Sequence, residues 1–201
     1  YELDKHNRGL NFLLLREINK LEDWILTPSY TMYLPVLRED YWENNTTARI
    51  LNRVEVDRAY ASEVLDFVKS SNEKEVIDVP FWQISKAYLF FLNKQYANAL
   101  KVIENIKTNV DAENEQLTII KALCLTAHQK KNEAIIVDEI KPILMNAAKE
   151  GNYRFLFAIA KELEFLKNTI DAGIIISHLK DYDANIFWKS RKDRITLSDD
   201  Y

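Results

Sequence analysis

Residues 81–103 read FWQISKAYLFFLNKQYANALKVI, and this stretch decides the fold class. It contains two alanines, Ala87 and Ala99, twelve residues apart on either side of the polar turn 93–95. Two helices can cross closely where each carries a small residue, so the pair predicts a helical hairpin. A connection this short forces the two helices to run antiparallel.

Two further alanine pairs have the same twelve-residue spacing, Ala122 with Ala134 and Ala160 with Ala172. The second pair follows the first by 35 residues, and the third follows the second by 38. A near-constant period with one small residue on each helix predicts stacked helical hairpins. The alternative is a non-repetitive helical bundle in which such pairs occur by chance.

The composition agrees with an all-α protein. The chain of 201 residues is 47% hydrophobic and 29% charged, which is typical of a globular domain. It contains only three glycines and four prolines, too few for the many tight turns of a sheet-rich fold. It begins at Tyr1 rather than at a methionine, and we expect it to be a fragment of a longer protein.

The first hairpin resembles a tetratricopeptide repeat. Such repeats have a small residue on the first helix, an aromatic residue three positions later, and Tyr-x-x-Ala at the start of the second helix. The matching positions here are Ala87, Phe90, Tyr96 and Ala99, with Ile103 at the next core position.

The second and third units match less closely. In the second, Lys131 replaces the tyrosine and Asp138 falls on the later core position. In the third, Leu163 and Thr169 take the places of the aromatic residue and the tyrosine. The usual Trp, Leu-Gly and terminal Pro signals of the family are absent or displaced.

The resemblance implies a right-handed α-solenoid of about nine or ten helices. We expect residues 1–78 to form a helical segment packed on the repeats, residues 79–187 to form three hairpins, and residues 188–201 to form a polar tail. Apolar periodicity predicts a first helix over 10–26 and another over 48–69. Thr27 and Pro28 read as the start of a new helix, with a kink or a restart at Pro35.

Farther along, the sequence predicts a helix from about residue 133 to 149 that Pro142 bends or splits. Gly151 and Asn152 then read as the C-terminal stop of that helix and the N-cap of the next. Helices over 153–166 and 169–179 would complete the third hairpin.

Charge and cysteine usage narrow the classes of partner. The net charge is −4 and the only dense basic cluster, in 189–194, is diluted by nearby aspartates, so we expect no nucleic-acid binding. No apolar run is long enough to insert in a membrane. The single cysteine, Cys124, rules out an internal disulfide and reads as a small buried hydrophobe.

Nothing in the sequence predicts catalysis. His6, His128 and His178 are far apart and do not have metal-ligand spacing, so we expect no metal site, and no cofactor motif is present. His128 is expected at an exposed helix end, and His178 is expected to pack. The chain contains no glycine-rich phosphate loop, serine elbow or Cys–His signature, and we expect it not to be an enzyme.

What remains is a surface for a protein or peptide partner. In the family that the repeat resembles, the first helix of each hairpin lines a concave groove, and carrying that register over gives a set of groove residues. These are Phe81, Tyr88, Phe91, Gln116, Leu123, Thr126, Arg154, Lys161 and Glu164. For Phe81, Tyr88 and Phe91, burial against the N-terminal helices is the alternative.

The predicted function is therefore a non-enzymatic adaptor or scaffold that binds a partner segment in a helical groove. The alternatives are a sensory module for a small molecule or glycan, and a purely structural spacer. An aromatic cluster invites the glycan reading, although its stripe spacing is what a packed helix gives anyway. The cluster is Trp24, Tyr30, Tyr33, Tyr41 and Trp42.

Overall fold

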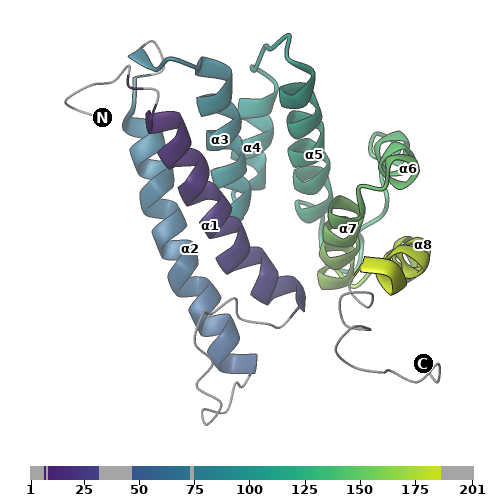
Figure 1. Ribbon diagram of the computed structural model, residues 1–201. Coiled ribbons are helices and arrows are strands. Elements are labelled where there is room, and N and C mark those ends of the chain that lie inside the picture. The colour runs from purple at the N-terminus through teal and green to yellow at the C-terminus, as the bar shows by residue number, and fades with distance from the viewer. Residues whose placement is uncertain (1–6, 8, 32–46, 73–74, 187–201) are drawn as a thin grey trace. The chain divides into compact units, whose positions relative to one another are not determined.

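The computed structural model describes residues 7, 9–31, 47–72 and 75–186. Within these residues the protein contains eight α-helices and no strands, which confirms the all-α prediction (Figure 1). The expected kink or restart at Pro35 and the polar tail 188–201 lie outside the described residues. The helices are α1 (Gly9–Thr31), α2 (Thr47–Ser70), α3 (Val79–Leu92), α4 (Tyr96–Ile103), α5 (Asp111–Ala127), α6 (Lys141–Glu150), α7 (Tyr153–Phe165) and α8 (Thr169–Ile186).

The chain divides into two compact units, Tyr1–Leu125 and Thr126–Tyr201, with the division inside α5. We call them the N-terminal unit and the C-terminal unit. In the N-terminal unit α1, α2 and α3 pack on one another, and α3 also packs on α4. In the C-terminal unit α7 packs on both α6 and α8.

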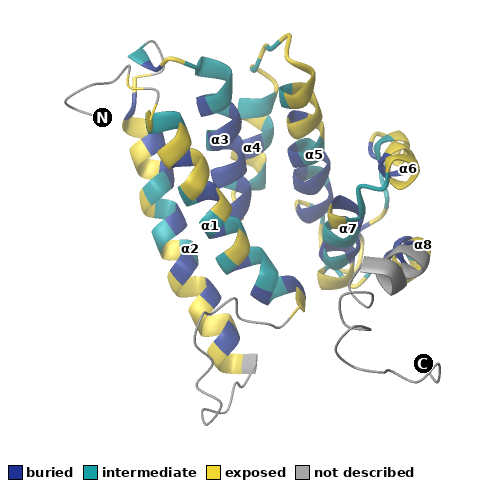
Figure 2. Cartoon of the chain, viewed as in Figure 1, coloured by how far each residue is buried: buried dark blue, intermediate teal, exposed yellow. Residues whose placement is uncertain are grey.

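The core of the N-terminal unit follows from the apolar stripes of its helices. Leu21 and Ile25 on α1 and Leu65 on α2 are almost fully buried. No residue of α3 is exposed, and Figure 2 shows this helix in the two colours of buried and intermediate positions. A helix that is apolar on most of its faces is buried on most of them, so α3 is the central element of this unit.

Helix α1 continues past the point where the sequence predicted a new start. Pro28 lies inside α1, in its last turn, and the prediction that Thr27 and Pro28 begin another helix is wrong. A proline so close to the helix end removes only one backbone hydrogen bond, and the ring of Pro28 is almost fully buried. The Ser29 hydroxyl donates to the carbonyl of Ile25, which adds a further bond to this turn.

The α3–α4 hairpin has the geometry that its sequence predicts. Asp78 caps α3 by accepting a hydrogen bond from the Phe81 amide at 3.0 Å. Ala87 on α3 and Ala99 on α4 are both fully buried, as expected where two helices cross closely. Lys94, with φ of 58°, ends α3 in the left-handed conformation that closes many helices.

The α7–α8 hairpin repeats this geometry. Ala160 and Ala172 are both buried, and Lys167 takes the place of Lys94, with φ of 69°. In each turn the amide of the lysine bonds to the carbonyl three residues earlier, and the next amide bonds to the carbonyl five residues earlier. Two of the three alanine pairs thus lie on packed neighbouring helices.

The middle alanine pair, Ala122 and Ala134, does not lie on two neighbouring helices. Ala134 lies in a non-helical segment, 134–137, and α6 begins only at Lys141, so the prediction of a helix from about residue 133 is wrong. Ile135, Ile136 and Val137 form a β-branched run of low helix propensity. Pro142 occupies the first turn of α6, where its missing N–H has no helical acceptor, whereas an earlier helix start would put the proline in the helix interior and cost a hydrogen bond.

The end of α6 is as predicted. Gly151 closes α6 in the left-handed conformation, with φ of 76°. The Asn152 side chain caps α7 by accepting from the Phe155 amide at 3.3 Å. These two residues turn the chain sharply between α6 and α7, which places α6 against α7 in the C-terminal unit.

Candidate functional site

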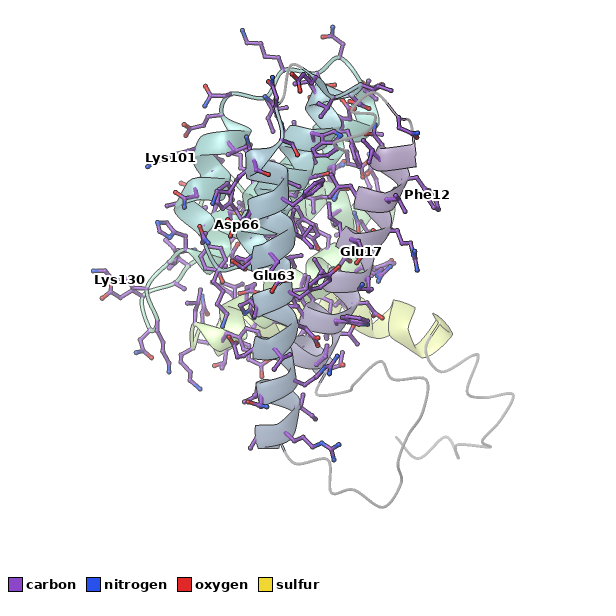
Figure 3. All side chains as sticks on the ribbon, turned by 90° about the vertical axis from the view of Figure 1, so that its left-hand side faces the viewer. Phe12, Glu17, Glu63, Asp66, Lys101 and Lys130 are labelled. Atoms are coloured by element: carbon purple, nitrogen blue, oxygen red, sulfur yellow. The ribbon has the colours of Figure 1, made fainter. Side chains whose placement is uncertain are left out.

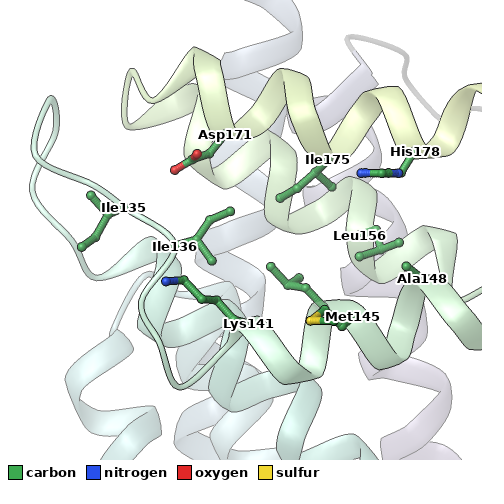
Figure 4. A pocket seen from close by; sticks show the side chains of 10 residues that line it. Ile135, Ile136, Lys141, Met145, Ala148, Leu156, Asp171, Ile175 and His178 are labelled. Carbon is green, nitrogen blue, oxygen red and sulfur yellow. The ribbon is translucent and has the colours of Figure 1, made fainter.

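The C-terminal unit contains an apolar groove of about 720 Å³ (Figure 4). We call it the α6–α8 groove because α6 forms one wall and α8 the other, with Leu156 of α7 between them. Its lining residues are Ile135, Ile136, Lys141, Leu144, Met145, Ala148, Leu156, Asp171, Ile175 and His178.

Helical periodicity produces both walls. On α6 the lining residues follow the spacing i, i+3, i+4, i+7 from Lys141 to Ala148, and on α8 the spacing i, i+4, i+7 from Asp171 to His178. Residues at these spacings share one face of a helix. The N-terminal residues of the two walls, Lys141 and Asp171, lie at the same end in Figure 4.

The groove is open to solvent along its length. Met145 on the α6 wall is 74% exposed and Ile135 at one end is 59% exposed. His178 is exposed as well, so the prediction that it packs is wrong; it forms part of the α8 wall instead. Leu144, Leu156 and Ile175 are buried and form the apolar interior.

A non-helical segment that bears Ile135 and Ile136 closes one end of the groove. The Gln129 side chain holds it with two hydrogen bonds: its amide nitrogen donates to the Ile135 carbonyl, and its amide oxygen accepts from the Ile135 N–H, both at 2.9 Å. The Asn168 side chain donates to the Ala134 carbonyl at 3.0 Å. The segment is therefore fixed by side-chain amides rather than by secondary structure.

Opposite charges lie on the two walls at this end. The Lys141 ammonium on α6 pairs with the Asp138 carboxylate at 2.6 Å, and both side chains are largely exposed. The Lys141 hydrogen bond lowers the pKa of Asp138 from its ordinary value. On α8 the Asp171 carboxylate accepts from the Asn168 amide at 2.6 Å.

The groove residues predicted from the family register lie elsewhere. Tyr88 and Phe91 are buried in α3, and Leu123 and Thr126 are buried in α5. Burial of an aromatic side chain in the core is the alternative given above for Tyr88 and Phe91. We therefore do not include these four residues in a binding surface.

The other predicted residues are more accessible. Phe81 is half-buried on α3, and Gln116 is exposed on α5. Arg154 and Lys161 lie seven residues apart on one face of α7, with Arg154 exposed. The Lys161 ammonium pairs with the Glu164 carboxylate at 2.5 Å. None of these residues lines the α6–α8 groove.

A polar network joins α1 to α2 in the N-terminal unit, where Figure 3 shows Glu17 on α1 and Glu63 on α2. The Glu17 carboxylate accepts from the Lys20 ammonium at 2.5 Å and from the Tyr60 hydroxyl at 2.9 Å. The Lys20 ammonium also lies 4.8 Å from the ring centroids of both Trp24 and Tyr60.

These contacts shift the pKa values of the network. The hydrogen bond from Lys20 holds the pKa of Glu17 below its ordinary value, and the same bond raises the pKa of Lys20. The hydrogen bond to Glu17 raises the pKa of Tyr60. All three groups are engaged with one another, which is typical of an interhelical clamp rather than of a reactive site.

The structure also shows where the cysteine, one histidine and part of the aromatic cluster lie. Cys124 is buried, and His128 is exposed at the end of α5, both as predicted. In the aromatic cluster, Trp24 is half-buried and Tyr30 is buried, whereas Tyr33, Tyr41 and Trp42 lie outside the described residues.

Over the described part of the chain, no group of three or more His, Cys, Asp or Glu residues could hold a metal ion. No helix in the same residues is long and apolar enough to cross a membrane.

Comparison with known proteins finds no relative. No family model matches the chain, and neither a curated protein nor a solved structure matches it. The resemblance to tetratricopeptide repeats stays a prediction from the residues.

Proposed function

We propose that this protein is a non-catalytic adaptor that binds a segment of a partner protein in the α6–α8 groove. The observation that carries the proposal is the groove itself: about 720 Å³, apolar within, with charged residues at its edges. An apolar interior with a polar rim is the usual anatomy of a protein interface. Met145 and Ile135 are exposed there and would bury apolar surface when a partner docks.

The openness of the groove favours a polypeptide over a small ligand. Pockets for drug-sized molecules usually enclose most of the ligand surface. Here one wall presents Met145 largely to solvent, and Ile135 at the end is exposed as well. A small molecule would remain half in water at this place, whereas a polypeptide covers an open groove and its rim together. The small-molecule or glycan module is the second candidate.

A displayed library of random 16-residue peptides, selected against the whole chain, tests the adaptor function. Fluorescence anisotropy should show that selected peptides bind the wild type. Met145→Glu should lower their affinity at least tenfold, because it puts a charge against buried apolar side chains. Met145 is 74% exposed, so its replacement leaves the fold intact.

Ile170→Glu is the matched control, since Ile170 is 76% exposed on α8 and does not line the groove. It should leave binding unchanged. Peptide binding that both variants reduce equally, or neither reduces, contradicts a site in the groove. Thermal stabilisation by compounds or glycans that Met145→Glu abolishes, with no peptide selected, would support the second candidate.

A further inference from the structure

We propose that the occupant of the α6–α8 groove is an amphipathic helix of about two turns, with an aliphatic stripe, an acidic residue facing Lys141 and a basic residue facing Asp171. This inference rests on the proposed function and specifies the partner. Three features of the groove restrict its occupant: the hydrogen bonds of its backbone, the length of its walls, and the charges on them.

The backbone of the groove disfavours an extended peptide. A strand docks by exchanging main-chain hydrogen bonds with a free edge. Among the residues that the structure describes, the only non-helical wall is the segment at Ile135, and both the N–H and the carbonyl of Ile135 are already bonded to Gln129. The Ala134 carbonyl is bonded to Asn168. An extended peptide would leave its own polar backbone groups unsatisfied against apolar side chains, whereas a helix satisfies them internally.

The length of the walls matches a short helix. The lining residues of each wall span eight positions, from Lys141 to Ala148 and from Asp171 to His178. At about 1.5 Å per residue, each wall is on the order of 10 Å long, or two helical turns. A partner helix that lies lengthwise therefore contacts the groove through residues at i, i+3 or i+4, and i+7.

Charge fixes the flanks of that helix. Lys141 stands on the α6 wall and Asp171 on the α8 wall, at the same end of the groove (Figure 4). The Lys141 ammonium also pairs with the exposed Asp138 carboxylate, so a partner carboxylate would share it, and Asp171 already accepts one hydrogen bond from Asn168. A helix between the walls presents one flank to each, so complementary charges are an acidic residue on the α6 side and a basic residue on the α8 side. Apolar residues between these flanks would contact Leu144, Leu156 and Ile175.

The peptides selected against the whole chain test this occupant. We expect the enriched sequences to share apolar residues at helical spacing, and the bound peptide to show helical carbon chemical shifts by NMR. A proline at its central position should reduce affinity by at least tenfold, because proline breaks a helix interior. An extended bound peptide that tolerates this proline would overturn the helical occupant and leave the proposed function standing.

A charge swap tests the flanks. Lys141→Glu should lower the affinity for the selected peptide two- to fivefold, which is the usual effect of a charge at the rim of an interface. Replacing the peptide's acidic residue by lysine should restore the affinity. Lys149→Glu is the matched control, because Lys149 is exposed on α6 and does not line the groove. Equal effects of the two variants, or no rescue by the reversed peptide, would overturn the assignment of the flanks.

Two other outcomes would overturn the partner helix itself, and the first of them would also overturn the proposed function. If no selected peptide is sensitive to Met145→Glu, both the occupant and the groove function fail. If sedimentation equilibrium shows that the wild type self-associates and Met145→Glu is monomeric, the occupant is a second copy of this chain and the inference of a partner helix is wrong.

Discussion

The Phe91 ring lies on α3 between two tyrosine rings. Its centroid is 5.8 Å from that of Tyr88 and 5.9 Å from that of Tyr96, and the side chain is only 3% exposed. Aromatic pairs at such distances add to the free energy of burial. At this position a side chain stabilises the fold and is not accessible to a partner.

Phe91→Ala should therefore lower the free energy of unfolding by about 3–5 kcal/mol, through lost burial and the cavity left behind. Urea denaturation followed by circular dichroism measures the change. Phe12→Ala is the control: Phe12 is 68% exposed on α1 (Figure 3), and its replacement should change the stability by less than about 0.5 kcal/mol. Equal effects at the two positions would contradict the core role of Phe91.

Glu17 should make stability depend on acid pH. Its pKa lies below the ordinary value of 4.5 in the folded protein, mainly because Lys20 donates to it. A lowered folded pKa gives stability that is present above about pH 4.5 and is lost as the pH falls through the folded pKa. The wild type should exceed Glu17→Gln in urea midpoint at pH 7, and this advantage should shrink as the pH approaches 3.

Glu63→Gln is the matched control for this experiment. Glu63 is exposed on α2, the helix that also carries Tyr60, and Figure 3 labels it there. Its replacement should give a difference from the wild type that is small at every pH. An advantage over Glu17→Gln that persists unchanged to pH 3 would show that the Glu17 carboxylate is not the titrating group.

At the scale of elements, the turn between α3 and α4 carries a local conformational cost. Lys94 has φ of 58°, a conformation in which a side chain is disfavoured and glycine is not. Lys94→Gly should raise the free energy of unfolding by about 0.5–1 kcal/mol, because it removes a left-handed cost of about 1–2 kcal/mol and adds a smaller entropy to the unfolded chain. The ion pair from Lys94 to Glu55 is lost at the same time, but both partners are more than half exposed and contribute little.

The same substitution at Lys101 should have the opposite sign. Lys101 is exposed in the helical part of α4, where glycine costs about 1 kcal/mol relative to a good helix former. Urea denaturation of the two variants side by side measures both changes. A loss of stability in both would show that the left-handed conformation of Lys94 is not a source of strain.

The elements that sequence could predict are those with local signals. The hairpin of α3 and α4 follows from Asp78 as N-cap, a short polar turn and one buried alanine on each helix. The turn from α6 to α7 follows from Gly151 and Asn152. Capping and turn chemistry are decided within a few residues, so they can be read without knowing the tertiary structure.

The elements that sequence missed depend on tertiary contacts. The segment at Ile135 has a β-branched run that disfavours a helix, but its place beside α8 depends on Asn168, which is distant in sequence and bonds the Ala134 carbonyl. Pro28 remains inside α1 because burial of its ring offsets the lost hydrogen bond. Neither partner is visible in a local pattern.

The candidate site shows the same limit. The spacing of Lys141, Leu144, Met145 and Ala148 on α6 was available in the sequence and predicts one helix face. That this face meets α8 across a groove depends on how α7 packs between α6 and α8. The family register instead selected Tyr88 and Phe91, which are aromatic because they are core.

At the scale of the whole molecule, the site belongs to one unit. Every lining residue of the α6–α8 groove lies after Thr126, in the C-terminal unit. Leu65→Ala, a change in the buried core of the N-terminal unit, should lower the melting temperature of the chain by several degrees.

The affinity of a groove-binding peptide should be unchanged in this variant at a temperature where circular dichroism shows it folded. Leu163→Ala is the matching change in the C-terminal unit, because Leu163 is fully buried in α7. This variant should bind the peptide with lower affinity. A folded Leu65→Ala protein that binds less tightly would show that the groove depends on the N-terminal unit.

The bond from Gln129 to Ile135 has a consequence for the chain in a crowded solution. An exposed non-helical segment of β-branched residues has main-chain groups with which strands of other chains can pair, and unpaired main-chain groups of this kind promote aggregation. The two hydrogen bonds of the Gln129 amide occupy the positions that an incoming strand would take at Ile135. Gln129 thereby leaves neither main-chain group of Ile135 open to pairing with another chain.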